Sequence, residues 1–202
     1  MIKTIIFDFG DVFINLDKPA TLKKFSELGK LPSTEKITAL NELYEVGKIS
    51  TKDFIGKIQH FFPNATAQQI IDAWNAILID FPEFRLEFLQ HLSSSRKYKL
   101  ILLSNTNELH INWIKENVSF YEEFKSCFDA FYLSHEIQLR KPEVEVFNFI
   151  LRKHQLSAHE TLFIDDTKEN TNAAASLGIH TWNNNPQRED ITELFTLKSS
   201  LF

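Results

Sequence analysis

Continuous runs of apolar residues, rather than alternating ones, recur along this chain. Four of them are rich in β-branched and aromatic side chains and end in polar residues, and a fifth is weaker: Lys3 to Phe9, Tyr98 to Asn105, Ala130 to Ser134, Thr161 to Asp166 and, weakest, His180 to Asn184. Strands that are hydrophobic on both faces are typical of a parallel sheet covered on both sides. The pattern therefore predicts an α/β fold with a mostly parallel sheet.

Segments with apolar residues at helical spacing separate the later strands. They are expected at Phe81 to Ser95, Glu108 to Val118, Glu143 to His154 and Lys168 to Leu177. Pro142 suits the first turn of the third helix, because its φ is fixed and its N–H is missing. Gly178 follows the fourth, where a left-handed residue commonly ends a helix.

The interval between the first and second strands is about 80 residues, too long for a single crossover helix. Four helical patterns fill it, at Ala20 to Leu28, Ser33 to Tyr44, Thr51 to Phe62 and Thr66 to Ile79. Ser33, Ser50 or Thr51, and Thr66 are suitable N-caps. We therefore predict a Rossmann-like core domain, residues 1–16 and 81–202, with a small α-helical cap domain, residues 17–80, inserted after the first strand.

Polar side chains follow four of the predicted strands. They are Asp8, Ser104 with Asn105, Ser134 with Lys141 seven residues later, and Asp165 with Asp166. Each residue alone could be an ordinary turn residue. The carboxyl ends of parallel strands meet at one edge, however, and ligands bind there. Carboxylates, a hydroxyl and an ammonium together suit phosphoryl transfer with Mg²⁺.

These residues, in this order, resemble the motifs of the haloacid dehalogenase-like (HAD) hydrolases over nearly the whole chain. The motifs are the strand that runs into Asp8, LLSNTN at Leu102 to Asn107, Lys141-Pro142, and FIDD at Phe163 to Asp166. The chain is most similar to the subgroup that contains a bacterial α-D-glucose-1-phosphate phosphatase and the phosphatase domain of epoxide hydrolases. The segments that carry this likeness are DFGDV from Asp8, ELYEVGKIS from Glu42, AWNAI from Ala73 and DDTKENTNAA from Asp165.

The resemblance implies a Mg²⁺ site around the first and last motifs. Asp8 would be the nucleophile, forming an aspartyl-phosphate, and also a metal ligand. Asp166 would be the second carboxylate ligand and the backbone carbonyl of Gly10 a third. Asp165 would lie beside the metal, ligating it directly or through water.

The resemblance also implies a phosphate site. Ser104 and Asn105 would bind phosphate oxygens, and Lys141 would neutralise charge around the nucleophile and the transferring phosphoryl group. The catalytic set is then Asp8, Lys141 and Ser104. The cap would close over them and exclude water.

One position departs from the family. Most of its phosphatases carry a second Asp two residues after the nucleophile, which protonates the leaving oxygen, whereas this chain has Gly10. Such acid-base help is typically worth about 10²–10⁴-fold. Asp11 and Lys48 are possible substitutes, and the sequence does not rank them.

The composition of the chain limits the kinds of partner that it is expected to bind. The 22 basic and 27 acidic residues give a formal charge of −5 without a basic patch, so no nucleic acid partner is expected. No apolar stretch is long enough to span a membrane, and Cys127, the single cysteine, has no internal partner. We expect a cytoplasmic monomer or homodimer that acts on a small phosphorylated metabolite.

Three functions fit these observations. The first is a Mg²⁺-dependent phosphatase whose substrate is a sugar phosphate. The second is carbon-halogen hydrolysis at the equivalent Asp, which needs no metal and is disfavoured by the adjacent Asp165 and Asp166. The third is a catalytically weakened protein that binds phosphometabolites, suggested by Gly10.

Overall fold

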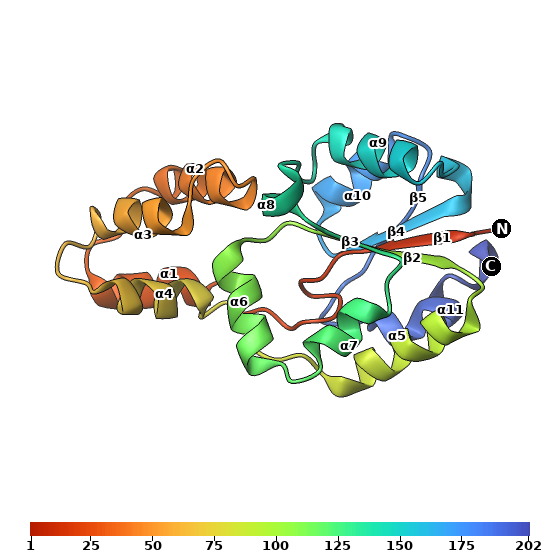
Figure 1. Ribbon diagram of the computed structural model, residues 1–202, viewed down its shortest axis with the longest axis horizontal. Coiled ribbons are helices and arrows are strands. Elements are labelled where there is room, and N and C mark those ends of the chain that lie inside the picture. The colour runs from red at the N-terminus through yellow and green to blue at the C-terminus, as the bar shows by residue number, and fades with distance from the viewer.

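The computed structural model describes all of residues 1–202 and contains one five-stranded parallel sheet (Figure 1). The strand order is β3-β2-β1-β4-β5. The strands are β1 (Thr4–Phe7), β2 (Lys99–Ser104), β3 (Ala130–Leu133), β4 (Thr161–Asp165) and β5 (His180–Asn183). All five were expected from the apolar runs, and the predicted α/β class with a parallel sheet is confirmed.

Helices cover both faces of this sheet, with α9 and α10 on one side and α5, α7 and α11 on the other (Figure 1). The helices after β1 that belong to this layer structure are α5 (Glu83–Ser95), α6 (Glu108–Asn117), α7 (Tyr121–Ser126), α8 (Ser134–Ile137), α9 (Val144–Lys153), α10 (Lys168–Ala175) and α11 (Leu194–Leu197). Single 3₁₀ turns lie at Ala158–Glu160, Ile191–Glu193 and Ser199–Leu201.

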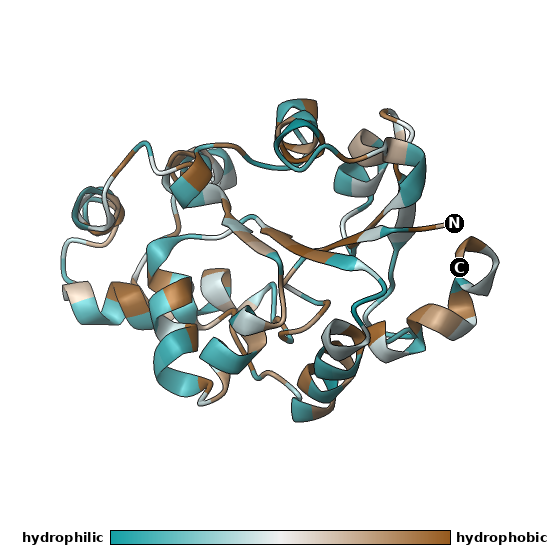
Figure 2. Cartoon of the chain, turned by 45° about the vertical axis from the view of Figure 1, so that its right-hand side comes forward, coloured by the Kyte–Doolittle hydropathy of each residue, from teal (hydrophilic) through white to brown (hydrophobic).

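Successive strand residues point to opposite faces, so the sheet separates two hydrophobic clusters. Ile5 and Phe7 of β1 belong to a cluster of 26 buried residues, and Ile6 belongs to a cluster of 10 that includes Phe147 of α9. Figure 2 shows the central strands as predominantly hydrophobic, whereas the helices carry both kinds of residue. No helix combines the length and apolar character that a membrane crossing requires.

Four helices between β1 and α5 form the helical insertion, residues 20–75, which lies to one side of the sheet (Figure 1). They are α1 (Ala20–Leu28), α2 (Thr34–Glu45), α3 (Thr51–Gln59) and α4 (Ala67–Asn75). Their apolar faces share a separate cluster of 11 buried residues, rich in aromatic rings. Phe25 stacks on Phe62, and Tyr44 stacks on Phe54.

Local sequence explains where these helices begin. The Ser50 hydroxyl accepts a hydrogen bond from the N–H of Asp53, and Thr66 forms a capping box with Gln69. Ser33 precedes α2 in an extended conformation but makes no side-chain cap bond.

Two predicted helix boundaries differ from the structure for identifiable reasons. The fourth pattern was expected to reach Ile79, but α4 ends at Asn75, because residues 77–80 pair with residues 15–17 to form the two-stranded connection to the insertion. Pro142 lies outside the helix that it was expected to begin. Its peptide bond with Lys141 is cis, Glu143 is the N-cap, and α9 begins at Val144.

The first turn of α6 joins the insertion to the sheet. Leu109 of α6 packs within the insertion's hydrophobic cluster, and its N–H donates to the Tyr44 hydroxyl at 3.2 Å. His110 stacks on Trp74 with ring centroids 5.5 Å apart. Burial lowers the pKa of His110 to about 4, so this ring is neutral where it packs.

We expect Gly47→Ala to destabilise the protein by roughly 1–3 kcal/mol, because Gly47 has a positive φ of 65° and a Cβ there would lie 2.4 Å from the main-chain oxygen of His135. Gly56→Ala is the matched control. Gly56 lies inside α3 with open space around it, so alanine should stabilise by about 0.5–1 kcal/mol. Urea unfolding of both variants measures the difference, and equal effects would contradict the expectation.

Candidate active site

Asp8 and Lys141 meet at the carboxyl end of the sheet, although 133 residues separate them. Asp8 directly follows β1, and the Lys141 Nζ donates to its Oδ1 at 2.7 Å. The same ammonium donates to Asp165 Oδ2 at 2.7 Å. Lys141 is 1% exposed, so this is a buried cation between two carboxylates.

Burial and charge shape the ionisation of this pair. Desolvation raises the pKa of Asp8 to about 7, which the attraction of Lys141 opposes and the neighbouring Asp165 carboxylate reinforces. Burial by itself would lower the pKa of Lys141, but the Asp165 and Asp8 carboxylates raise it above its ordinary value. Lys141 is therefore a permanent positive charge beside Asp8.

Asp165 is fully occupied by donors from its own segment and from Lys141. Its Oδ1 accepts from the N–H of Thr167 at 2.8 Å, and the Asn170 amide donates to both carboxylate oxygens at 3.1 and 3.0 Å. It is 0% exposed. Both oxygens are thus engaged, and the geometry fits a carboxylate that orients Lys141.

Three carboxylates approach one another closely enough to share a cation. One oxygen from each of Asp8, Asp165 and Asp166 lies within 4.8 Å of the others. Burial raises the pKa of Asp166, and the contact with Lys18 opposes this rise. Hard carboxylate oxygens in this arrangement fit a divalent cation such as Mg²⁺.

Lys18 is a second cation at this cluster. Its Nζ donates to Asp166 Oδ2 and lies 3.0 Å from Asp11 Oδ2. Lys18 lies two residues before α1, and no pattern in the sequence indicated a role for it.

Ser104 and Asn105, both predicted phosphate contacts, differ in their surroundings. The Ser104 side chain is buried at the end of β2, and its hydroxyl makes no hydrogen bond with another residue. The Asn105 amide is engaged twice: its Oδ1 accepts from the Lys141 N–H at 2.9 Å, and its Nδ2 donates to the Lys141 carbonyl at 2.8 Å. Asn105 thus fixes the backbone of Lys141.

Ser134, which follows β3, also serves the backbone. Its hydroxyl donates to the Thr106 carbonyl at 3.0 Å and accepts from the Thr106 N–H at 3.0 Å. Ser134 therefore holds the segment between β2 and α6.

The space beside Gly10 is filled. A Cβ at this position would lie 2.8 Å from Leu16 Cδ1, so Leu16 takes the room that a side chain would use. Asp11 adopts a positive φ of 53°, and its Oδ1 accepts from the Leu16 N–H at 3.1 Å. Asp11 is engaged with its own loop and with Lys18, while Lys48 is exposed and forms no ion pair.

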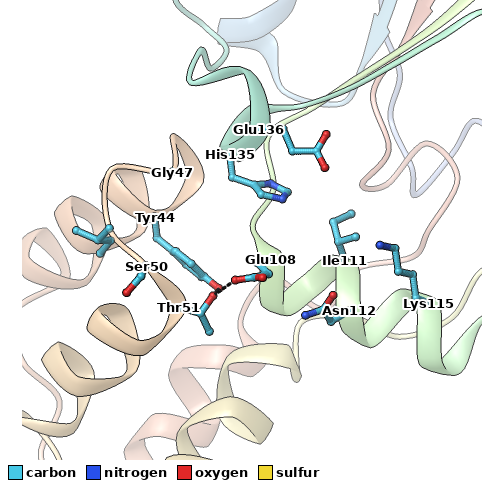
Figure 3. A pocket seen from close by; sticks show the side chains of 11 residues that line it. Tyr44, Gly47, Ser50, Thr51, Glu108, Ile111, Asn112, Lys115, His135 and Glu136 are labelled. Carbon is cyan, nitrogen blue, oxygen red and sulfur yellow. Dashed lines mark hydrogen bonds between the residues drawn. The ribbon is translucent and has the colours of Figure 1, made fainter.

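A cavity of about 440 Å³ lies between the helical insertion and α6 and α8 (Figure 3). Its lining is mostly polar and comes from both parts of the chain: Tyr44, Gly47, Ile49, Ser50, Thr51, Glu108, Ile111, Asn112, Lys115, His135 and Glu136. The Thr51 hydroxyl donates to the Glu108 carboxylate across the junction. Asp8, Ser104 and Lys141 do not line this cavity, so it does not contain the acidic cluster.

A parallel α/β sheet with a buried acid–lysine cluster at its carboxyl end, and a helical insertion after the first strand, is the arrangement of one class of hydrolases. The sequence model of haloacid dehalogenase-like hydrolases matches residues 2–178, and the chain belongs to this family. The chain is 30% identical over 191 residues to the D-ribitol-5-phosphate phosphatase of Bacteroides thetaiotaomicron, with 90% of this chain and 91% of that protein covered.

Solved structures agree with this placement. A HAD family enzyme from Bacteroides thetaiotaomicron, in complex with magnesium and inorganic phosphate, superposes with a TM-score of 0.82 at 33% identity, covering 96% of this chain and 100% of that one. A HAD-like family hydrolase from Porphyromonas gingivalis superposes with a TM-score of 0.84 at 26% identity, covering 100% and 98%.

Proposed function

We propose that this hydrolase is a Mg²⁺-dependent phosphatase that acts on a small phosphorylated metabolite, a sugar or sugar-alcohol phosphate, through an aspartyl-phosphate on Asp8. The observation that carries the proposal is the buried contact of Lys141 with Asp8 inside the cluster of three carboxylates. The similarity to a D-ribitol-5-phosphate phosphatase supports the substrate class.

The carboxylates of Asp8 and Asp166, with the Gly10 carbonyl, would hold Mg²⁺. Bound there, the ion supplies positive charge that offsets the carboxylates and the phosphate oxygens. Asp165 would lie beside the ion and hold Lys141, since its oxygens are already engaged.

The bond-making and bond-breaking steps use the chain's own residues and water. The Asp8 carboxylate attacks phosphorus, the bond from phosphorus to the substrate oxygen breaks, and that oxygen leaves with a proton from water. The Ser104 hydroxyl donates to a phosphate oxygen and the Lys141 ammonium neutralises charge. Water then attacks phosphorus, and the bond to Asp8 breaks to release inorganic phosphate and the free carboxylate.

Residues 17–80 would act as a cap over this chemistry. The helical insertion contacts α6 and α8, which follow β2 and β3 at the same edge of the sheet as Asp8. Closure would exclude water from the phosphoenzyme.

Phosphate release from a panel of sugar, sugar-alcohol and p-nitrophenyl phosphates tests the proposal. We expect release that requires Mg²⁺, stops in EDTA and returns when Mg²⁺ is added in excess. Because Gly10 supplies no acid, the p-nitrophenyl ester, which has a good leaving group, should react fastest at saturation. Release that EDTA does not affect would contradict the metal assignment, and no release from any ester would contradict the phosphatase assignment.

A further inference from the structure

Arg140, the residue directly before Lys141, reaches across to the helical insertion. Its Nη1 lies 3.2 Å from Glu42 Oε1 and its Nη2 lies 3.1 Å from Glu45 Oε2. Both glutamates are on α2, three residues apart and on one helix face. Figure 1 shows the end of α2 beside α8, the helix that precedes this loop. These are the only ion pairs between the insertion and the segment that carries Lys141.

The pair with Glu45 is not an ordinary surface ion pair. The Glu45 side chain is 14% exposed, and its other oxygen accepts from the Asn41 amide at 2.9 Å. Burial raises the pKa of Glu45, which Arg140 opposes. Removing one partner of such a pair leaves an uncompensated buried charge, so the contact favours one arrangement of α2 against the loop. The planar arginine fork contacts the two glutamates through separate nitrogens, Nη1 and Nη2, so one side chain is held in a fixed orientation by both.

The same short segment is held from its other side by the end of β2. Asn105 accepts from the Lys141 N–H and donates to the Lys141 carbonyl. Gly47, just after α2, sits directly against the His135 carbonyl of α8. Residues 140–141 are therefore held at two points: the Arg140 side chain pairs with α2, and the Lys141 backbone bonds to Asn105. The Lys141 side chain extends from this segment to Asp8.

We propose that Arg140 is a positioning residue that couples docking of α2 to the placement of the Lys141 ammonium between Asp8 and Asp165. The inference rests on the proposed function insofar as Lys141 acts on the phosphoryl group. The contact exists only while α2 lies against α8, so Lys141 is fully held only when the insertion is docked. The coupling makes insertion docking part of assembling the reactive centre.

Kinetics of three variants test the coupling: Arg140→Gln, the double variant Glu42→Gln/Glu45→Gln, and their combination. We expect Arg140→Gln and the glutamate pair each to lower kcat by about 10-fold with KM changed less than about 2-fold, because the reacting groups rather than substrate binding are misplaced. The combination should be no slower than the slower parent, since both remove one contact. The kcat of Arg140→Lys should lie between that of the parent protein and that of Arg140→Gln.

Two controls match these changes. Arg152→Gln removes an exposed arginine of α9, and Glu27→Gln breaks an exposed ion pair of α1. Both should keep the parent kcat. A lowered melting temperature with unchanged kcat in Arg140→Gln, or effects that multiply in the combined variant, would overturn the proposal.

Amide hydrogen exchange separates this inference from the proposed function, because it needs no turnover. Arg140→Gln should raise exchange both in residues 138–143 and at the end of α2, whereas Arg152→Gln should raise it in neither. Raised exchange in α2 alone would overturn the coupling even if the protein is an active phosphatase. Raised exchange in both segments of a protein that releases no phosphate would support the coupling and refute the phosphatase.

Discussion

Asp8→Asn is expected to abolish phosphate release, by about 10⁴-fold or more, and to leave the fold intact. The amide is a very poor nucleophile, while its oxygen can still accept from the Lys141 ammonium as Asp8 Oδ1 does at 2.7 Å. Because burial and the nearby Asp165 disfavour the charged form of Asp8, replacing it with a neutral group of the same shape should not lower the melting temperature.

The experiment is phosphate release measured beside thermal unfolding. Asp72→Asn, at an exposed position of α4, is the control for the chemical change and should keep full activity. Near-normal release from Asp8→Asn would rule out attack by Asp8. Loss of release together with loss of the folded state would not count as support, so the circular dichroism spectrum of the variant must match the parent.

Lys141→Met is expected to cost about 3–5 kcal/mol of unfolding free energy as well as activity. The substitution keeps the apolar stem of the side chain but removes the only ammonium in contact with Asp8 and Asp165. Those carboxylates would then face each other in a buried site. Urea unfolding without metal measures the loss, and Lys115→Met, at an exposed position of α6, should change the free energy little.

A double variant tests whether the lost charge or the lost packing causes the destabilisation in Lys141→Met. In Asp8→Asn/Lys141→Met one of the two carboxylates is already neutral, so the destabilisation by methionine should be smaller than in the parent protein. An equal loss in both backgrounds would mean that packing of the lysine stem, rather than charge, stabilises the site. A loss below about 1 kcal/mol in Lys141→Met would contradict the picture of a buried counter-charge.

The apolar runs predicted the sheet well because a doubly covered parallel strand must be hydrophobic on both faces. Polar residues at the strand ends then placed Asp8, Lys141 and Asp165 together, since parallel strands bring their carboxyl ends to one edge. Local capping signals at Ser50 and Thr66 likewise predicted helix starts. In each case the residues on which the prediction depends lie within a few positions of the strand or helix concerned.

Contacts between distant segments could not be predicted in this way. Nothing near Asn105 indicates that its amide is spent on the backbone of Lys141, and nothing near Lys18 or Arg140 indicates a carboxylate partner far along the chain. The end of α4 was missed for the same reason, because pairing of the linker strands ends it. Asn170 could have been found, since it lies one helical turn from the Asp165 segment in DDTKEN.

Leu109 of α6 connects the hydrophobic interior of the helical insertion to the sheet domain. It belongs to α6, which follows β2, yet it is part of the hydrophobic cluster of a segment that ends more than thirty positions earlier, with α5 and β2 between them. The hydrophobic cluster of the insertion is therefore complete only when α6 lies against it. We therefore expect the insertion to unfold together with the sheet rather than as an independent unit.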